Sequence, residues 1–310
     1  MMWNALIDRQ TGFLNFTHEM AEAMRGTVVA AVGTGGNGVI LDNLARIGFE
    51  RFILVDPDVI EDTNLNRMPF TMAEIGLPKV QAWERYLKAV NPDCRVETHQ
   101  RAVCRHDGPW LTDLLGKADL VFLGTTSLVA NLVVGRISAR LGKRMIVGPG
   151  SSGAWVVSTF VHDNDITFEK VAGYGTEHLD LTAIDYPSLI PKFQALSFYP
   201  GRKRKLYPKV RQDMLAGNLP ARSCKIFVSL VNAAMAFEAV KNVAVMHGLP
   251  LEGTRLVVMP VFHIFDPYSG CAYYYHILNR EIGIPDWLTG EIRWQPYSDE
   301  QDVVTASRRG

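Results

Sequence analysis

The stretch Val28–Arg67, VVAAVGTGGNGVILDNLARIGFERFILVDPDVIEDTNLNR, decides the fold of this chain. It opens with an apolar run, Val28–Val32, which is followed by a glycine-rich segment and then by apolar residues at helical spacing up to Gly48. That order predicts a strand, a tight turn, a helix and a helix stop. A second apolar run, Arg51–Val55, predicts the neighbouring strand.

The glycine-rich segment matches the G-x-G-x-x-G spacing at Gly33, Gly35 and Gly38, with Gly36 as an additional glycine. We expect the first glycine to permit a tight turn, the second to leave bare backbone beside a phosphate, and the third to permit close helix–strand contact. Unpaired N–H groups at the helix start attract such a phosphate. Asp56 follows the second strand, where a carboxylate can accept hydrogen bonds from ribose hydroxyls. The pattern predicts a nucleotide site; glycines that only shape a turn are the alternative.

A second polar series follows Asp56 along the chain, at Asp58, Asn64, Arg67 and Lys79. A dinucleotide dehydrogenase has no chemical need for this series, whereas a site that cleaves a triphosphate does. Arg67 and Lys79 can neutralise charge on the phosphates and on the leaving pyrophosphate, and the Asn64 amide can hold an oxygen. The glycine spacing and Asp56 alone also fit an NAD-dependent oxidoreductase, which stays as an alternative.

At these residues the chain resembles the ThiF/MoeB/HesA family, adenylyltransferases related to the ubiquitin-activating enzymes. The resemblance covers most of Arg9–Ile277, and its motifs follow the family order. They are Arg9-Gln10, Gly33–Gly38, Leu54–Asp58, Asn64–Arg67, Gly76–Val80, Arg222–Cys224 and Ala234–Lys241. In that family ATP adenylates the C-terminal carboxylate of a small ubiquitin-like protein or peptide, or a related carboxylate. The resemblance therefore implies ATP as cofactor, a homodimer, and a ubiquitin-like carrier protein or a peptide as partner.

The resemblance also implies roles for individual residues. Arg9 would reach into the site of the other subunit, and Asp56 would hold the ribose. The triphosphate would be held by Asn64, Arg67 and Lys79, so that catalysis is mostly positioning and charge stabilisation.

Cys224 matches a cysteine that takes part in sulfur transfer in ThiF itself but not in its close relatives. It stands at the start of a long helical segment, Lys225–Met246, whose N-terminus can lower the pKa of a thiol. A small residue packed at a helix start is the alternative reading.

The chain departs from the family pattern at Leu123–Ser127, which reads Leu-Gly-Thr-Thr-Ser. The family carries Asp-x-Thr-Asp-Asn at this point, and one of those carboxylates binds magnesium. Because Mg²⁺ usually relies on one or two carboxylates plus substrate phosphates, Thr126 would be a weak replacement. Either Asp58 or a partner supplies the charge, or ATP holds the ion, or the adenylation activity has been lost.

Alternating strands and helices predict an α/β fold with a doubly wound, mostly parallel Rossmann-like sheet. Further strands are expected at Arg95–Gln100, Leu120–Leu123, Arg144–Val147, Ala154–Val161 and Ile166–Val171. Helices are expected at Thr17–Met24, Ile75–Ala89, Trp110–Leu115 and Leu128–Leu141, the first of them capped by Thr17. The runs Arg255–Phe265 and Ala272–Ile277 predict a hairpin in a C-terminal mixed or antiparallel extension.

We divide the chain into a helical arm (1–26), a nucleotide-binding part (27–150), a substrate-binding and dimerisation part (151–297) and a mobile tail (298–310). The third part contains an aperiodic segment, about 173–220, where the family has a crossover loop around the tail of its protein substrate. A basic run lies in it, Gly201–Lys205 with Lys209 and Arg211 behind. This run is either a solvated loop or a dock for an acidic partner or an RNA backbone.

Composition excludes several classes of function. Lys plus Arg (32) equals Asp plus Glu (32), so no global basic field favours nucleic acid. The cysteines Cys94, Cys104, Cys224 and Cys271 form no C-x-x-C pair, so no structural zinc is expected. The start of the chain does not resemble a secretion signal, and free thiols suit the cytoplasm. Charged residues recur in Lys225–Met246, which therefore predicts a core or dimer-interface helix and no membrane span.

These observations predict ATP-dependent adenylation of a carboxylate. A non-catalytic nucleotide-binding protein that recognises a partner tail is the second hypothesis, supported by the missing carboxylates. His18, His247, His263 and His276 have no metal-ligand spacing, and we expect surface or core roles for them.

Overall fold

The computed structural model describes residues 2–148, 155–162, 165–195, 208–215, 218, 223–286 and 289–297. The basic run Gly201–Lys205, Arg222 and the predicted tail 298–310 lie outside these residues. The expectations for those segments therefore stay predictions.

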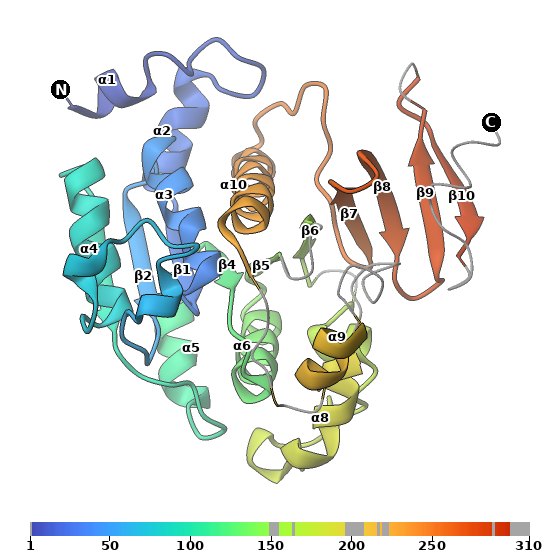
Figure 1. The fold of residues 1–310 in the computed structure, drawn as a ribbon. Coiled ribbons are helices and arrows are strands. Elements are labelled where there is room, and N and C mark those ends of the chain that lie inside the picture. Colours follow the sequence, from blue (N-terminus) through green and yellow to red (C-terminus); the bar gives the residue numbers. More distant parts are fainter. Residues whose placement is uncertain are drawn as a thin grey trace.

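The described strands form one ten-stranded sheet in the order β10-β9-β8-β7-β6-β5-β4-β1-β2-β3 (Figure 1). Their bounds are β1 Val28–Val32, β2 Arg51–Val55, β3 Arg95–His99, β4 Leu120–Leu123, β5 Arg144–Val147, β6 Trp155–Phe160, β7 Val261–Asp266, β8 Cys271–His276, β9 Glu281–Pro285 and β10 Ile292–Pro296. Strands β1 to β5 run parallel, and from β6 onward neighbours pair antiparallel. The predicted fold class is confirmed, while β9 and β10 were not predicted.

The strand order reverses between β1 and β4, where the chain switches the face on which its crossover helices lie. Helices α3 and α4 pack on one face of the parallel strands, and α5 and α6 pack on the other. The helix bounds are α1 Met2–Ile7, α2 His18–Gly26, α3 Val39–Arg46, α4 Lys79–Val90, α5 Gly108–Gly116, α6 Leu128–Arg140, α7 Phe168–Ala172, α8 Tyr186–Ala195, α9 Pro208–Leu215 and α10 Lys225–His247. In a doubly wound sheet, ligands bind at the carboxyl ends of the strands beside this reversal.

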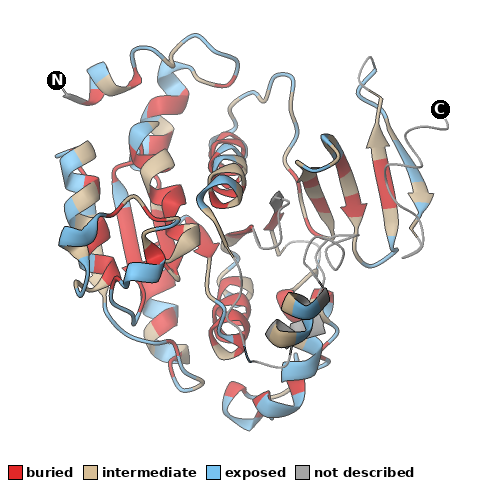
Figure 2. Ribbon diagram, in the orientation of Figure 1, coloured by how far each residue is buried: buried red, intermediate tan, exposed pale blue. Residues whose placement is uncertain are grey.

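Continuous apolar runs form β1, β2, β4 and β5 because both of their faces are covered, whereas the edge strand β3 (RVETH) is polar and only partly buried. In β1, Ala30 and Val32 belong to the core under α5 and α6, whereas Val29 and Ala31 belong to the core under α2, α3 and α4. Figure 2 shows the central strands β1, β2 and β4 as mostly buried. The expected cap of α2 is confirmed, since the Thr17 hydroxyl accepts a hydrogen bond from the Met20 N–H at 3.1 Å.

Several expected elements differ in the structure. The strand expected at Arg255–Phe265 begins only at Val261. The segment at about 173–220, expected without periodic structure, contains helices α8 and α9 among its described residues.

Ile166–Val171 was expected as a strand but contains the start of helix α7, because Thr167 caps the helix and Gly173 ends it with φ = 65°. The helix expected from Ile75 begins only at Lys79. Gly76 has φ = 86°, a left-handed conformation that cannot belong to an α-helix.

Helix α10 has the length and composition of a membrane span, with 61% of its most apolar window buried in this structure. It packs against α2, α3 and strands β5 and β6. Glu238 and Lys241 form a buried ion pair on it, and the Lys241 Nζ also donates to the Arg255 carbonyl at 2.9 Å. These contacts make α10 a core helix that joins the parallel and antiparallel parts of the sheet, as Figure 1 shows.

Candidate nucleotide site

The glycine turn begins where β1 ends and lies directly against the end of β4. Gly33 has φ = 86°, and a Cβ on it would stand 2.6 Å from the Gly124 carbonyl carbon. A Cβ on Gly124 would in turn stand 2.7 Å from the Gly33 oxygen. Both distances are shorter than a Cβ contact permits, so the packing of the two strand ends leaves no room for a side chain at either position. The left-handed conformation of Gly33 is one that glycine adopts readily.

The other glycines of the motif differ in their surroundings. A Cβ on Gly35 would meet nothing within 4 Å, so no packing within the described chain requires glycine there. A Cβ on Gly38 would stand 2.8 Å from Nε1 of Trp83 on α4. The expected helix–strand contact at Gly38 is therefore wrong: the close approach is between two helices. Trp83 also donates from Nε1 to the Thr34 carbonyl at 2.8 Å, which ties α4 to the turn.

Asp56 lies under the turn and holds it. Its Oδ2 accepts hydrogen bonds from the Thr34 N–H at 2.6 Å and the Thr34 hydroxyl at 3.2 Å, and Oδ1 accepts from the Asp58 N–H at 3.0 Å. Asp56 is only 4% exposed. Because a carboxylate oxygen can accept two hydrogen bonds, Oδ1 retains capacity for one more donor.

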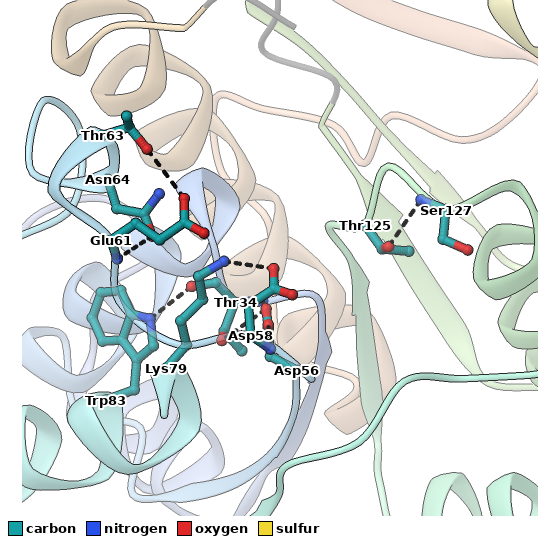
Figure 3. A network of polar contacts seen from close by, with 10 residues as sticks. All are labelled: Thr34, Asp56, Asp58, Glu61, Thr63, Asn64, Lys79, Trp83, Thr125 and Ser127. Carbon is teal, nitrogen blue, oxygen red and sulfur yellow. Dashed lines mark hydrogen bonds and ion pairs between the residues drawn. The ribbon is translucent and has the colours of Figure 1, made fainter. Parts of the chain in front are cut away.

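Asp58 and Lys79 form an ion pair beside the turn, and Figure 3 shows them grouped with Thr34 and Asp56. The Lys79 Nζ lies 2.8 Å from the Asp58 Oδ2, and the Lys79 N–H donates to the Asp58 carbonyl at 2.9 Å. The Lys79 side chain is 10% exposed and that of Asp58 is 62% exposed. The pair therefore fixes a largely buried ammonium group at the start of α4.

The Asn64–Arg67 loop brings a second cation to the turn. Asn64 is buried, and its Oδ1 accepts from the Glu61 N–H at 3.3 Å, which closes a capping box. The Arg67 Nη1 donates to the Thr63 carbonyl at 2.8 Å. A Cβ on Gly36 would lie 3.4 Å from the Arg67 Cδ, so the arginine stem passes directly over the glycine turn.

The segment before α10 also reaches this loop. Asn66 donates from Nδ2 to the Ser223 carbonyl at 3.0 Å. Cys224 follows as the N-cap residue of α10, without a capping bond from its side chain, and it is half-buried. All four cysteines of the chain are free thiols. The structure therefore places Cys224 next to the Asn64–Arg67 loop.

The residues at the end of β4, Leu123–Ser127, carry no charged side chain. The Thr125 hydroxyl accepts from the Ser127 N–H at 3.1 Å, and Thr126 is exposed. Leu123, the last residue of β4, is buried. Within the residues that the structure describes, no group of three or more His, Cys, Asp and Glu side chains is arranged to hold a metal ion.

Arg9 lies away from the glycine turn of its own chain. Its neighbour Gln10 donates from Nε2 to the Ile47 carbonyl at 2.8 Å, and Trp3 donates to the Gly48 carbonyl at 3.2 Å. Both acceptors follow the C-terminal end of α3, whereas the turn precedes its N-terminal end. Arg9 is exposed there. The structure thus brings Arg67 and Lys79 to the turn but not Arg9.

Sequence reasoning missed Thr34 and Trp83 as parts of this site. Thr34 occupies a variable position of the glycine motif, so nothing in the motif singles it out. Trp83 stands four residues after Lys79, and this spacing places the two on one face of a helix. That spacing is the signal that could have found it.

Comparison with known proteins matches residues 7–258 to the model of the ThiF family. Ubiquitin-like modifier-activating enzyme 5 of Drosophila virilis is 48% identical over 79 residues, and the D. persimilis protein shows the same identity over the same length. These matches span 25% of this chain but only about a fifth of the relatives, 20% and 21% of their lengths.

Solved structures share the fold. PaaA superposes with a TM-score of 0.62 at 18% identity, covering 88% of this chain and 73% of PaaA. Escherichia coli MccB with ATP gives a TM-score of 0.61 at 16% identity, covering 83% of this chain and 66% of MccB. Together with the family match over most of its length, these findings establish that the chain belongs to the ThiF family.

Proposed function

We propose that this chain uses ATP to adenylate a carboxylate, namely the C-terminus of a small ubiquitin-like or sulfur-carrier protein or of a peptide. Family membership supports the reaction class. One observation carries the proposal: Arg67 and Lys79 come from separate motifs and meet the same glycine turn. Two cations at a phosphate-binding turn suit a reaction that develops charge on a leaving pyrophosphate.

The turn fits a nucleotide in three respects. The Cβ position of Gly35 faces open space, so a phosphate can approach the backbone there. The turn precedes helix α3, whose N-terminal N–H groups favour an anion. Asp56 keeps acceptor capacity on Oδ1 while it fixes the turn, which suits a ribose hydroxyl as the additional donor.

The proposed step needs no covalent participation of a side chain. A carboxylate oxygen of the substrate attacks the α-phosphorus of ATP, a new O–P bond forms, and the bond to the β-phosphate oxygen breaks. The products are an acyl adenylate and pyrophosphate. Arg67 and Lys79 stabilise the departing charge, and Lys79 exchanges its contact with Asp58 for a contact with the phosphates.

Magnesium would neutralise phosphate charge when bound with ATP. The β4 side does not fit an ion held by protein carboxylates, because Leu123 and Thr126 stand where the family has Asp. We therefore propose that the phosphates themselves hold Mg²⁺, with the exposed Asp58 as a nearby carboxylate, and we assign no step to the ion.

A homodimer is part of this proposal. Arg9 is exposed on an arm that runs past the C-terminal end of α3. From that position it can act on ATP only in the site of a second copy of the chain. Cross-linking tests whether the chain forms dimers. Mixing Arg9→Ala chains with Lys79→Ala chains tests the role of Arg9: in a mixed dimer, the site that keeps Lys79 receives an intact Arg9 from the other chain, so one of the two sites should regain activity.

The second candidate is a member that binds a nucleotide and a partner tail without catalysis, and the uncharged Thr126 favours it. The deciding experiment measures ATP binding by calorimetry and ATP–pyrophosphate exchange with a panel of carriers ending in Gly-Gly and of short peptides. The panel includes peptides because E. coli MccB has been crystallised with MccA as well as with ATP. Exchange supports adenylation, whereas tight ATP binding without exchange supports the second candidate. Binding of NADH but not of ATP would point to an oxidoreductase and overturn both.

A further inference from the structure

A buried asparagine on α10 holds the backbone of the glycine turn from behind. Asn232 is 0% exposed, and its Nδ2 donates to the Gly36 carbonyl at 3.2 Å and to the Val228 carbonyl at 2.7 Å. Gly36 and Asn232 lie far apart in sequence, so this bond joins the C-terminal helix to the phosphate-binding motif.

A second asparagine, on α6, holds the opposite side of the site in the same way. Asn131 is 7% exposed, and its Nδ2 donates to the Thr125 carbonyl at 3.0 Å and to the Ser127 carbonyl at 2.7 Å. Each asparagine thus binds the helix carbonyl four residues before it and one carbonyl of a loop at the site. The two loops are the ones that meet where β1 and β4 end.

The orientation of the Asn232 amide follows from its partners. Both neighbours are carbonyl oxygens, so the NH₂ group must face them and the reversed amide would place three oxygens together. The Asn232 Oδ1 is consequently buried without a partner among the described residues. A buried acceptor without a donor destabilises a fold. The unpartnered Oδ1 is a cost to stability, which points to the bond that holds the Gly36 carbonyl as the reason for an amide at this position.

Holding a carbonyl also aims the next N–H group. In a trans peptide the C=O and the following N–H point in opposite directions. With the Gly36 carbonyl turned toward α10, the Asn37 N–H points away from α10. With the Thr125 carbonyl turned toward Asn131, the Thr126 N–H points away from it.

We propose that Asn232 and Asn131 are positioning residues that orient the two loops for phosphate before ATP binds. The inference rests on the proposed function, because ATP is the ligand that it names. It predicts that each asparagine contributes to nucleotide affinity, although neither contacts the reacting atoms.

The test uses Asn232→Leu and Asn232→Ala, with Asn131→Leu for the other loop. Asn242→Leu is the matched control, because Asn242 is a buried asparagine on the same helix with the same bond to a carbonyl four residues earlier. Asn242 is fully partnered: it also donates to the Thr159 hydroxyl at 3.0 Å and accepts from Arg144 at 3.2 Å. Its replacement should lower the melting temperature and leave ATP affinity unchanged.

We expect Asn232→Leu to weaken ATP binding roughly fivefold, with KM for ATP rising by the same factor while kcat changes less than about twofold. The melting temperature should stay the same or rise, because the orphaned Oδ1 is removed. Amide hydrogen exchange of the ATP-free protein should become faster at residues 34–38. In Asn131→Leu the faster exchange should appear at residues 124–127.

Unchanged ATP affinity and unchanged exchange at residues 34–38 in both Asn232 variants would overturn the inference while leaving the proposed function intact. A loss of melting temperature equal to that of Asn242→Leu, with no change in KM, would also overturn it. Failure of the wild-type protein to bind ATP would overturn the proposed function and this inference with it.

Discussion

The two sides of the candidate nucleotide site carry different chemistry. On the β2 side, Asp56, Asp58 and Lys79 form a charged network around the turn. On the β4 side, Thr125 and Thr126 offer only hydroxyl and backbone groups. Charge is retained where phosphates would be held and missing where the family carries a metal-binding carboxylate. The contrast separates a charged part of the site from an uncharged part, and the predictions below test whether the two parts serve different ligands.

The largest effect is expected on the charged side. Replacing Arg67 or Lys79 by Ala should lower ATP–pyrophosphate exchange by about 10²–10³-fold, because each removes a cation at the leaving pyrophosphate. Exchange of labelled pyrophosphate into ATP measures this. Lys88→Ala is the control: Lys88 lies on the same helix as Lys79 and is paired with Glu84 at 2.7 Å. An equal loss of pyrophosphate exchange in all three variants would mean that removing any cation lowers the activity. The charged side of the site would then have no specific role in catalysis.

A smaller effect is expected when the turn loses its carboxylate. Asp56→Asn keeps the volume but leaves one acceptor oxygen where Asp56 has two, so either the Thr34 or the Asp58 N–H loses its partner. ATP affinity should fall about tenfold, measured by calorimetry. Asp119→Asn is the control, because Asp119 accepts from the Val28 N–H at 2.8 Å at the other end of β1. If both variants bind ATP like the wild type, the turn does not depend on Asp56.

The uncharged side can be tested by restoring a carboxylate at position 126, where the family has Asp. Thr126→Asp should lower the Mg²⁺ concentration needed for half-maximal exchange by about fivefold, as one added charge near the ion would. Thr126→Asn supplies a side chain of similar size without charge and should leave the Mg²⁺ dependence unchanged. An identical Mg²⁺ titration for Thr126→Asp and the wild type would show that position 126 does not face the ion.

The smallest effect is expected at Cys224. Its side chain caps nothing, so Cys224→Ala should keep pyrophosphate exchange within about twofold of the wild type. Any covalent adduct with a carrier, detected by intact-protein mass spectrometry, should disappear. A large loss of ATP–pyrophosphate exchange in this variant would place the thiol in the adenylation step. The charged residues on the β2 side would then not be sufficient for that step.

Patterns within short segments predicted the parallel half of the fold. β1, β2, β4 and β5 have the predicted bounds because their runs are buried on both faces and end at glycine or polar residues. Helix α7 escaped prediction because Ile166, Thr167, Phe168 and Val171 favour a strand by composition. A buried ion pair joins Glu169 of this helix to Arg136 of α6, and the spacing of apolar residues along the sequence cannot reveal such a contact between distant segments.

The candidate site could be predicted in its charges but not in its geometry. Asp56 and Lys79 follow from motif spacing, and both lie at the turn. The partners that hold them are set by contacts between distant segments: Trp83 on Thr34, and Asn232 on Gly36. Residue spacing specifies which groups share an element, but the meeting of two elements depends on how the whole sheet is covered.

The joint between Gly33 and Gly124 has a consequence for how this chain tolerates change. At either glycine an added methyl group would meet backbone atoms of the other segment, which cannot rotate or repack, so the group can be absorbed only by moving a strand end. Such a movement would displace Thr34 on one side and Thr125 on the other. Substitution of either glycine is therefore blocked by the backbone of the other segment, so the two positions must both stay glycine for the strand ends to keep their places.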